Sequence, residues 1–204
     1  MDEADAEGLT DRYPFLSSRQ THDCLSFSCP PEKLADFSES LRDVEGFEML
    51  VDATGVDWGL EVTPRFSTVY HFYSLVRRSY LRLSCECPDD QSPEVPSISG
   101  VYPAADWHER EIFDMFGISF SGHGNLKRIL MWDSYPYHPL RKDFPLAGIE
   151  VPLPADDVAE VTEASVEPAP MMGGPFVSPP HGRVSEAEPR AKDESWTEEL
   201  QKPS

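Results

Sequence analysis

The side chains best suited to metal binding or catalysis lie on one predicted helix and in the loop that follows it. His108 and Glu111 are three residues apart, so both face one side of a helix, and His123 follows in a Gly/His loop. These side chains could share a metal ion, but the zinc-protease pattern needs a second His four residues after the first, where this chain has Ile112. We therefore interpret this face as ion-paired or solvated, and a stand-alone metalloenzyme using His108, Glu111 and His123 is the alternative.

The four cysteines are a second candidate for metal chemistry. Cys24, Cys29, Cys85 and Cys87 match none of the usual zinc or iron–sulfur spacings. We interpret them as small buried hydrophobic residues, with a set of four cluster ligands as the alternative. Walker, Rossmann and Gly-x-Ser-x-Gly patterns do not occur in the sequence.

A basic, proline-containing block follows at residues 138–145, with the sequence HPLRKDFP. Its two prolines reduce the entropy lost on docking, and Arg141 and Lys142 form the strongest positive spot on an acidic chain. Two interpretations stay open: a surface loop with incidental charges, or a preorganised clamp for carboxylates of a neighbouring protein. On the second, changing both residues to Glu weakens assembly without unfolding the domain.

Composition limits the classes of partner. The chain has 204 residues with 37 acidic and 17 basic side chains, a net charge of −20. This balance argues against nucleic acid and against adsorption on an anionic membrane. The sequence has no apolar run of about 18 residues and no signal-peptide pattern at its start, so we expect a cytosolic chain, or one docked on something cytosolic.

Hydrophobic periodicity predicts an α+β fold, with a small mixed or antiparallel sheet and two main helices. The helices are predicted over residues 31–44 and 103–116, ending before Gly46 and Gly117. On the second helix, Arg110 and Asp114 are four residues apart and are expected to pair. The predicted strands are 25–29, 47–51, 66–76, 80–87 and 127–131, with loops at 52–59 and 88–97.

The chain divides into three predicted segments: a polar, frayed segment at 1–20, an α+β domain at 21–148 and an extended or disordered tail at 149–204. The tail holds 9 of the 20 prolines, and its 12 acidic and 4 basic residues give a net charge of −8. Such a composition cannot bury enough apolar surface to offset the entropy of ordering.

Two motifs resemble one known family. Glu109-Arg110-Glu111 precedes Asp114-Met115-Phe116, His123 follows at the family's spacing, and the block at 138–146 closes the pattern. Over roughly residues 20–148 the chain resembles the 30-kDa subunit family (the C subunits) of respiratory complex I, the NADH:quinone oxidoreductase. The motif residues, which we expect at an interface with other subunits, are Glu109, Arg110, Glu111, Asp114, Gly117, His123, Arg128, His138, Pro139, Arg141, Lys142, Asp143 and Pro145.

The resemblance implies a non-catalytic structural subunit of the peripheral arm of a proton-translocating complex. It implies contact with the 49-kDa D subunit and with the B and I subunits, and membrane contact only through partners, at the cytoplasmic face of the bacterial inner membrane. It implies no cofactor on this chain, with FMN, iron–sulfur clusters, NADH and quinone on other subunits. The alternative is the equivalent subunit of a membrane-bound hydrogenase or another quinone-linked dehydrogenase.

Overall fold

The computed structural model describes residues 3–19, 21, 23–145, 149, 151–152 and 165–166. The chain divides into two units, 1–143 and 144–204. In the second unit, the two-residue strands β8 (Val151–Pro152) and β9 (Ser165–Val166) pair antiparallel. Apart from residue 149, the rest of the predicted extended tail lies outside the described residues. No helix in the described ranges is long and apolar enough to cross a membrane.

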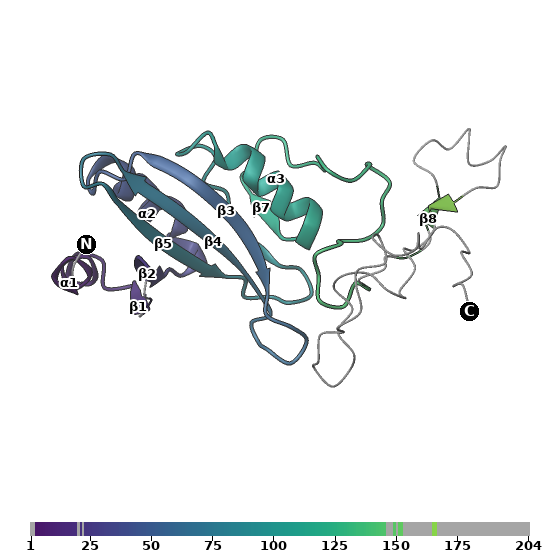
Figure 1. Cartoon of the computed structure of the whole chain (residues 1–204), viewed down its shortest axis with the longest axis horizontal. Helices are drawn as coiled ribbons and strands as arrows, with labels where there is room; N and C mark the ends of the chain where they lie inside the picture. The colour runs from purple at the N-terminus through teal and green to yellow at the C-terminus, as the bar shows by residue number, and fades with distance from the viewer. Residues whose placement is uncertain are drawn as a thin grey trace, which may run out of the picture. The chain divides into compact units, whose positions relative to one another are not determined.

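The first unit is built on a five-stranded mixed sheet with the order β1-β2-β5-β4-β3 (Figure 1). Within this sheet only the β2–β5 pair is parallel, because the chain crosses over between them through helix and strands. The predicted α+β class with a mixed sheet is confirmed. The strands are β1 (Ser17–Arg19), β2 (Leu25–Ser28), β3 (Met49–Asp57), β4 (Phe66–Ser74) and β5 (Ser79–Glu86).

Three helices and a two-stranded parallel ribbon complete the described part of the unit. The helices are α1 (Glu3–Arg12), α2 (Pro31–Asp43) and α3 (Ala105–Phe116), and the ribbon joins β6 (Glu94–Pro96) to β7 (Ser119–Ser121). As predicted, α2 begins at a proline and is followed by Gly46, whose φ of 73° lets the Phe47 amide donate to the Leu41 carbonyl at 3.0 Å.

The core lies on the face of the sheet that α2 and α3 cover. Alternation along β5 places Leu81, Leu83 and Cys85 on this face, and all three are fully buried. On β4, Phe72 contacts the ring of Tyr102 at a centroid distance of 5.0 Å. The core therefore continues from the sheet into the segment that leads into α3.

Helix α3 packs directly on β3 because β3 has a glycine at the contact. A Cβ atom added at Gly55 would lie 2.7 Å from a ring carbon of Phe116 and 3.0 Å from a methyl carbon of Ile112. Both side chains lie on the buried side of α3. A side chain at position 55 would push the helix away from the sheet.

Four predictions of local structure were wrong. Residues 52–57, expected to be a loop, form the second half of β3. The sequence hid this strand because Ala53, Gly55 and Asp57 occupy inward positions that usually hold large apolar residues. Within the predicted loop 88–97, residues 94–96 form β6. The N-terminal segment, expected to be frayed, contains α1, whose Leu9 is only 1% exposed.

The strand predicted at residues 127–131 does not form. Three successive backbone amides, of Ile129, Leu130 and Met131, converge on one side-chain oxygen of Asp114 instead of pairing with a strand. A carboxylate thus takes the place of a neighbouring strand.

Candidate functional site

Asp114 is the centre of the first motif. Its side chain is fully buried, and its Oδ2 accepts hydrogen bonds from Ile129, Leu130 and Met131 at 2.9, 2.7 and 2.9 Å. Its Oδ1 accepts from Arg128 at 2.6 Å. Arg128 also donates to the Tyr137 carbonyl at 3.1 Å, so one helical carboxylate fixes the path of the segment leading to the basic block.

The hydrogen bonds to Asp114 stabilise its charged form. Burial alone would raise the pKa of Asp114, but the amides of Met131 and Leu130 and the guanidinium of Arg128 outweigh it and lower the pKa. Asp114 is therefore ionised at neutral pH. The predicted Arg110–Asp114 pair does not form, because Arg110 instead lies over the Trp107 ring at 4.8 Å and donates to the Lys127 carbonyl.

Glu109, one and a half turns earlier, is buried in a poorer environment. Its Oε1 accepts from the Ile98 amide at 2.8 Å and its Oε2 from the Ser97 hydroxyl at 2.5 Å. The His123 Nε2 lies 3.8 Å from the same Oε2. Burial raises the pKa of Glu109 to about 7, despite the lowering effect of the two hydrogen bonds. Glu109 is thus a buried carboxyl that changes charge near neutral pH.

His123 is held in one tautomer beside Glu109. The Asn125 amide donates to His123 Nδ1 at 3.0 Å, so the proton of the neutral ring is on Nε2. This Nε2 donates to the Asp106 carbonyl at 3.2 Å, and the ring is fully buried. His123 therefore ties the loop after β7 to the first turn of α3.

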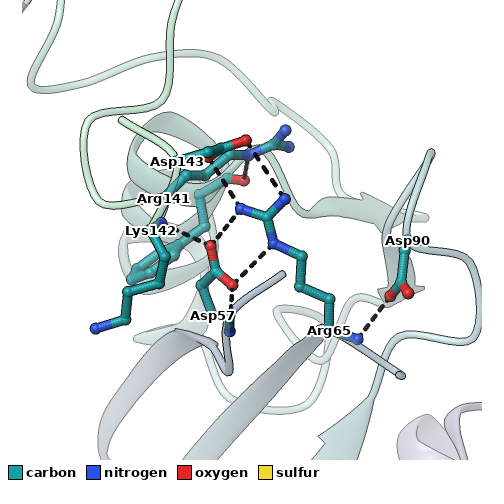
Figure 2. Close-up of polar contacts among 8 residues, drawn as sticks. Asp57, Arg65, Asp90, Arg141, Lys142 and Asp143 are labelled. Atoms are coloured by element: carbon teal, nitrogen blue, oxygen red, sulfur yellow. Dashed lines mark hydrogen bonds and ion pairs between the residues drawn. The ribbon is translucent and has the colours of Figure 1, made fainter. Parts of the chain in front are cut away.

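The second motif, the basic block, is anchored by a cluster at the end of β3. Asp57 is fully buried and accepts from Arg65 Nε and Nη2 at 2.9 and 2.6 Å (Figure 2). The Lys142 amide donates to Asp57 Oδ2 at 2.8 Å, and Arg65 also donates to Asp143 Oδ1 at 2.9 Å. We call Asp57, Arg65, Lys142 and Asp143 the latch, because they fasten residues 142–143 to the sheet.

The latch is strongly ionic. Burial alone would raise the pKa of Asp57, but Arg65 and the amides of Lys142 and Gly59 outweigh it and lower the pKa to about 2. Asp57 therefore keeps its charge at any physiological pH. Arg65 in turn spans two carboxylates, Asp57 from the sheet and Asp143 from the basic block.

Arg141 is directed inward and binds its own chain. Its Nε donates to the Phe116 carbonyl at 2.6 Å, and its guanidinium lies 5.0 Å from the centre of the Phe66 ring. Gly117, with a φ of 71°, makes room for it, since an added Cβ would lie 2.5 Å from Arg141 Nη2 and 2.6 Å from His138. These contacts argue against the expectation that Arg141 can be reversed in charge without harming the fold.

The side chain of His138 is held by its own chain, whereas the side chain of Lys142 is exposed. The His138 Nδ1 donates to the Asp114 carbonyl at 3.0 Å, and burial lowers the pKa of its ring. Lys142 is held only through its backbone, and its exposed ammonium points away from the latch and has no ion-pair partner among the described residues (Figure 2). Pro139 is half-buried, and Pro145 belongs to the second unit.

After these internal contacts, a set of side chains around α3 stays exposed. Trp107, Leu130 and Leu140 are 63%, 61% and 52% exposed. The exposed side chains of the motifs and their neighbours are called the motif surface; they belong to Trp107, Glu111, Leu130, Leu140 and Lys142. Exposed large apolar side chains, Trp in particular, are typical of a protein–protein contact.

The candidate metal ligands are not brought together in the described part of the chain. His108 faces Asp52 at 3.8 Å, while His123 is buried against Asp106. Across the described residues, no group of three or more His, Cys, Asp or Glu side chains is arranged to hold a metal ion. The four cysteines are free; Cys29, Cys85 and Cys87 are buried, and burial raises the pKa of each thiol.

Comparison with known proteins identifies the family. The family model described as "Respiratory-chain NADH dehydrogenase, 30 Kd subunit" matches residues 27–150, more than half of the chain. The chain belongs to this family. The match includes both motifs and the latch, and it ends where the second unit has just begun.

Curated relatives belong to the same type of subunit. The chain is 48% identical over 124 residues to the second C subunit of the NADH-quinone oxidoreductase of Rhizobium etli, covering 60% of this chain and 65% of the relative. It is 40% identical over 158 residues to the corresponding C subunit of Phenylobacterium zucineum, covering 78% and 74%. The chain thus spans between about two thirds and three quarters of these relatives' length.

A solved structure shares the fold. The structure of the membrane-bound sulfane sulfur reductase, an archaeal respiratory membrane complex, contains a chain with a TM-score of 0.61 and 23% identity. The alignment covers 79% of this chain and 91% of that chain. The likeness supports the fold of this chain at low sequence identity.

The sequence pointed to the motifs but missed the latch. Asp57 and Arg65 lie about eighty residues before the block that they fasten, so no local pattern links them. A signal was present in retrospect: Asp57 follows Ala53 and Gly55 at period-two spacing, which continues β3 to the carboxylate.

Proposed function

We propose that this chain is a non-catalytic structural subunit of the peripheral arm of a proton-translocating NADH:quinone oxidoreductase. Its motif surface would contact the quinone-site subunit (the 49-kDa D subunit), near the B and I subunits. The complex would lie at the cytoplasmic face of the bacterial inner membrane. FMN, iron–sulfur clusters, NADH and quinone would be bound by other subunits.

The proposal rests on one observation: some motif side chains bind their own chain, while others are exposed. Asp114, Arg128 and Arg141 are engaged with their own chain, whereas Lys142 and three large apolar side chains are exposed. A catalytic site needs polar groups that converge on a substrate, but these converge on backbone amides and carbonyls. Their arrangement supports a rigid surface for a partner.

A second candidate is the equivalent subunit of another membrane-bound respiratory complex, such as a hydrogenase. The observation that favours it is the fold shared with the sulfane sulfur reductase chain. The two candidates differ in the subunits that accompany this chain. Identifying those subunits therefore separates them.

The first experiment is affinity purification of the tagged chain from gently solubilised membranes, with the co-purifying chains identified. Recovery of a quinone-site subunit with an NADH-oxidising module supports the complex I proposal. Recovery of a nickel-bearing large subunit supports the hydrogenase-type alternative. Recovery of a monomeric chain alone contradicts both.

The interface is tested by reversing one exposed charge. Lys142→Glu is expected to reduce the amount of co-purified 49-kDa subunit at least several-fold, because like charges across an interface are strongly unfavourable. Lys33→Glu makes the same change on the exposed face of α2 and is the matched control. Equal recovery from the two variants contradicts a role for Lys142 at the interface.

A further inference from the structure

The β4–β5 hairpin ends in an apolar tip that its turn does not require. Leu75 and Val76 are 59% and 85% exposed. Tight hairpin turns favour Gly, Asn and Asp, but the tip here reads Leu-Val-Arg-Arg. Arg78 adopts a φ of 50°, a region that residues other than Gly and Asn seldom occupy. The needs of the turn therefore do not explain these side chains.

The apolar tip continues onto the outer face of the sheet, which α2 and α3 leave uncovered. Strand pairing places Met49 beside Tyr73 and Tyr73 beside Tyr80, with the two tyrosine rings 4.8 Å apart. Met49 and Tyr80 are 44% and 50% exposed. We call Met49, Tyr73, Leu75, Val76 and Tyr80 the hairpin patch. An apolar surface of this kind, rimmed by charges, marks an interaction site.

One arginine beside the patch lacks a counter-charge. Arg77 pairs with Glu45 at 3.5 Å and Arg82 with Asp23 at 2.6 Å, but Arg78 has no ion-pair partner among the described residues. Arg78 and Tyr80 also line a hollow of about 250 Å³, together with Asp23, Cys24, Leu25 and Ser79. The patch therefore offers a depression next to an exposed guanidinium.

We propose that the hairpin patch binds a segment of a partner protein that presents a carboxylate to Arg78 and an apolar side chain to the exposed rings and aliphatic side chains of the patch. This inference rests on the proposed role as a subunit of a larger complex. An exposed arginine without an ion pair in the described part of the chain stands out at a net charge of −20, and a carboxylate is its complement. The aromatic rings and Arg78 are the residue types that dominate binding at such contacts.

Other occupants fit less well. A second copy related by a two-fold axis through the patch would bring Arg78 close to its own equivalent, and like charges oppose such contact. An anionic membrane would meet Asp23 and Glu48 at the rim of the patch, on an acidic chain. The chain's own C-terminal residues also carry carboxylates, and crosslinking distinguishes them from a partner segment.

The hairpin patch would be a second contact, separate from the motif surface. Strand β4 runs from Phe66, whose ring centre lies 4.6 Å from the guanidinium of the latch residue Arg65, to Ser74, next to the hairpin tip. Nine extended residues span about 30 Å, so the two ends can contact different partners or distant parts of one partner. The chain would then join two surfaces of the complex.

The test places a photo-crosslinking benzoylphenylalanine at Val76 of the full chain, expressed in cells that make the whole complex. Parallel probes are placed at Leu140 on the motif surface and at Glu39, which is exposed on α2. The crosslinked peptides are identified by mass spectrometry of the purified complex. The Leu140 probe tests the proposed function, so the two ideas can fail separately.

The Val76 probe is expected to yield a partner peptide with Asp or Glu next to an apolar residue, and the Glu39 probe is not. Crosslinks from Val76 to the chain's own C-terminal residues, to a second copy or to lipid overturn the proposal, as does their absence. If Leu140 crosslinks to another protein of the complex and Val76 does not, the structural role stands and the second contact is rejected.

Substitutions at Arg78 separate binding from folding. Arg78→Asn removes the charge but suits the positive φ, so the Tm of the full chain should not fall. Binding of the crosslinked partner should weaken about tenfold, as expected for loss of one charged contact. Arg78→Lys keeps the charge and should retain most of the binding. Equal retention of the partner by the Asn and Lys variants contradicts the carboxylate contact.

Discussion

The two halves of α3 each bury a carboxylate, and the chain treats the two differently. Asp114 receives three backbone amides and a guanidinium, which lower its pKa, whereas Glu109 receives an amide and a hydroxyl, and burial raises its pKa to about 7. A buried carboxylate is thus a permanent anchor only where enough donors surround it. The C-terminal half of α3 is fixed by charge, and the N-terminal half is sensitive to pH.

The largest effect is expected from Asp114→Asn. The change leaves Arg128 without its carboxylate and turns an amide group towards the donors of residues 129–131, so the free energy of unfolding should fall by about 4 kcal/mol. Urea denaturation of the full chain measures the loss. Glu111→Gln, on the exposed side of the same helix, should change the stability by less than about 0.5 kcal/mol. Similar values for both variants would contradict the role of Asp114 as an anchor.

The next effect depends on pH and concerns Glu109. Its pKa is near 7 in the folded chain and 4.5 for an unburied glutamate, so the unfolded state loses this proton first as pH rises. The stability due to protonated Glu109 is therefore present below pH 4.5 and is lost as pH rises to about 7, by up to about 3 kcal/mol. Glu109→Gln should remove this loss, as unfolding measured from about pH 4.5 to 8 would reveal. A stability difference between wild type and variant that does not change with pH would contradict the raised pKa.

A smaller effect is expected at Gly117, which joins α3 to the basic block. Gly117→Ala combines an unfavourable positive φ with a Cβ 2.5 Å from Arg141 Nη2, and should cost about 2 kcal/mol. Gly46→Ala has the same φ problem, at 73°, but no atom within 4 Å of the added Cβ, and should cost about 1 kcal/mol. Thermal unfolding of the two variants separates backbone strain from steric contact. If the two glycines respond alike, Arg141 does not press on position 117.

The sequence predicted those elements whose apolar residues follow a clear period. The alternation of Leu81, Leu83, Cys85 and Cys87 predicted β5, and Pro31 with Gly46 bounded α2. It failed where small or polar residues fill inward positions, as at Gly55 and Asp57 in β3, because α3 and Arg65 occupy the space that large side chains usually fill. The hydropathy of a residue does not reveal which distant side chain will pack against it.

The sequence predicted the motif residues as a group, but it did not predict which side chains bind their own chain and which are exposed. Charge and spacing placed Arg141 and Lys142 together as one clamp, and the resemblance assigned both to an interface. The structure separates them, because Arg141 reaches the Phe116 carbonyl while only the backbone of Lys142 is held. The Arg141 contact depends on Gly117 and on the end of α3, more than twenty residues earlier, which local patterns do not reveal.

Asp114, Arg128 and Arg141 stabilise the fold of the domain, and we propose that the exposed motif surface binds partners. The most direct measurement compares Arg141→Gln with Lys142→Gln, each tested for unfolding of the full chain and for recovery of the complex. We predict that Arg141→Gln lowers the free energy of unfolding by about 2 kcal/mol, through loss of a charged hydrogen bond and the Phe66 contact. Lys142→Gln should leave unfolding unchanged and reduce recovery of partner subunits. A destabilised Lys142→Gln variant, or an Arg141→Gln variant as stable as the wild type, would contradict the claim.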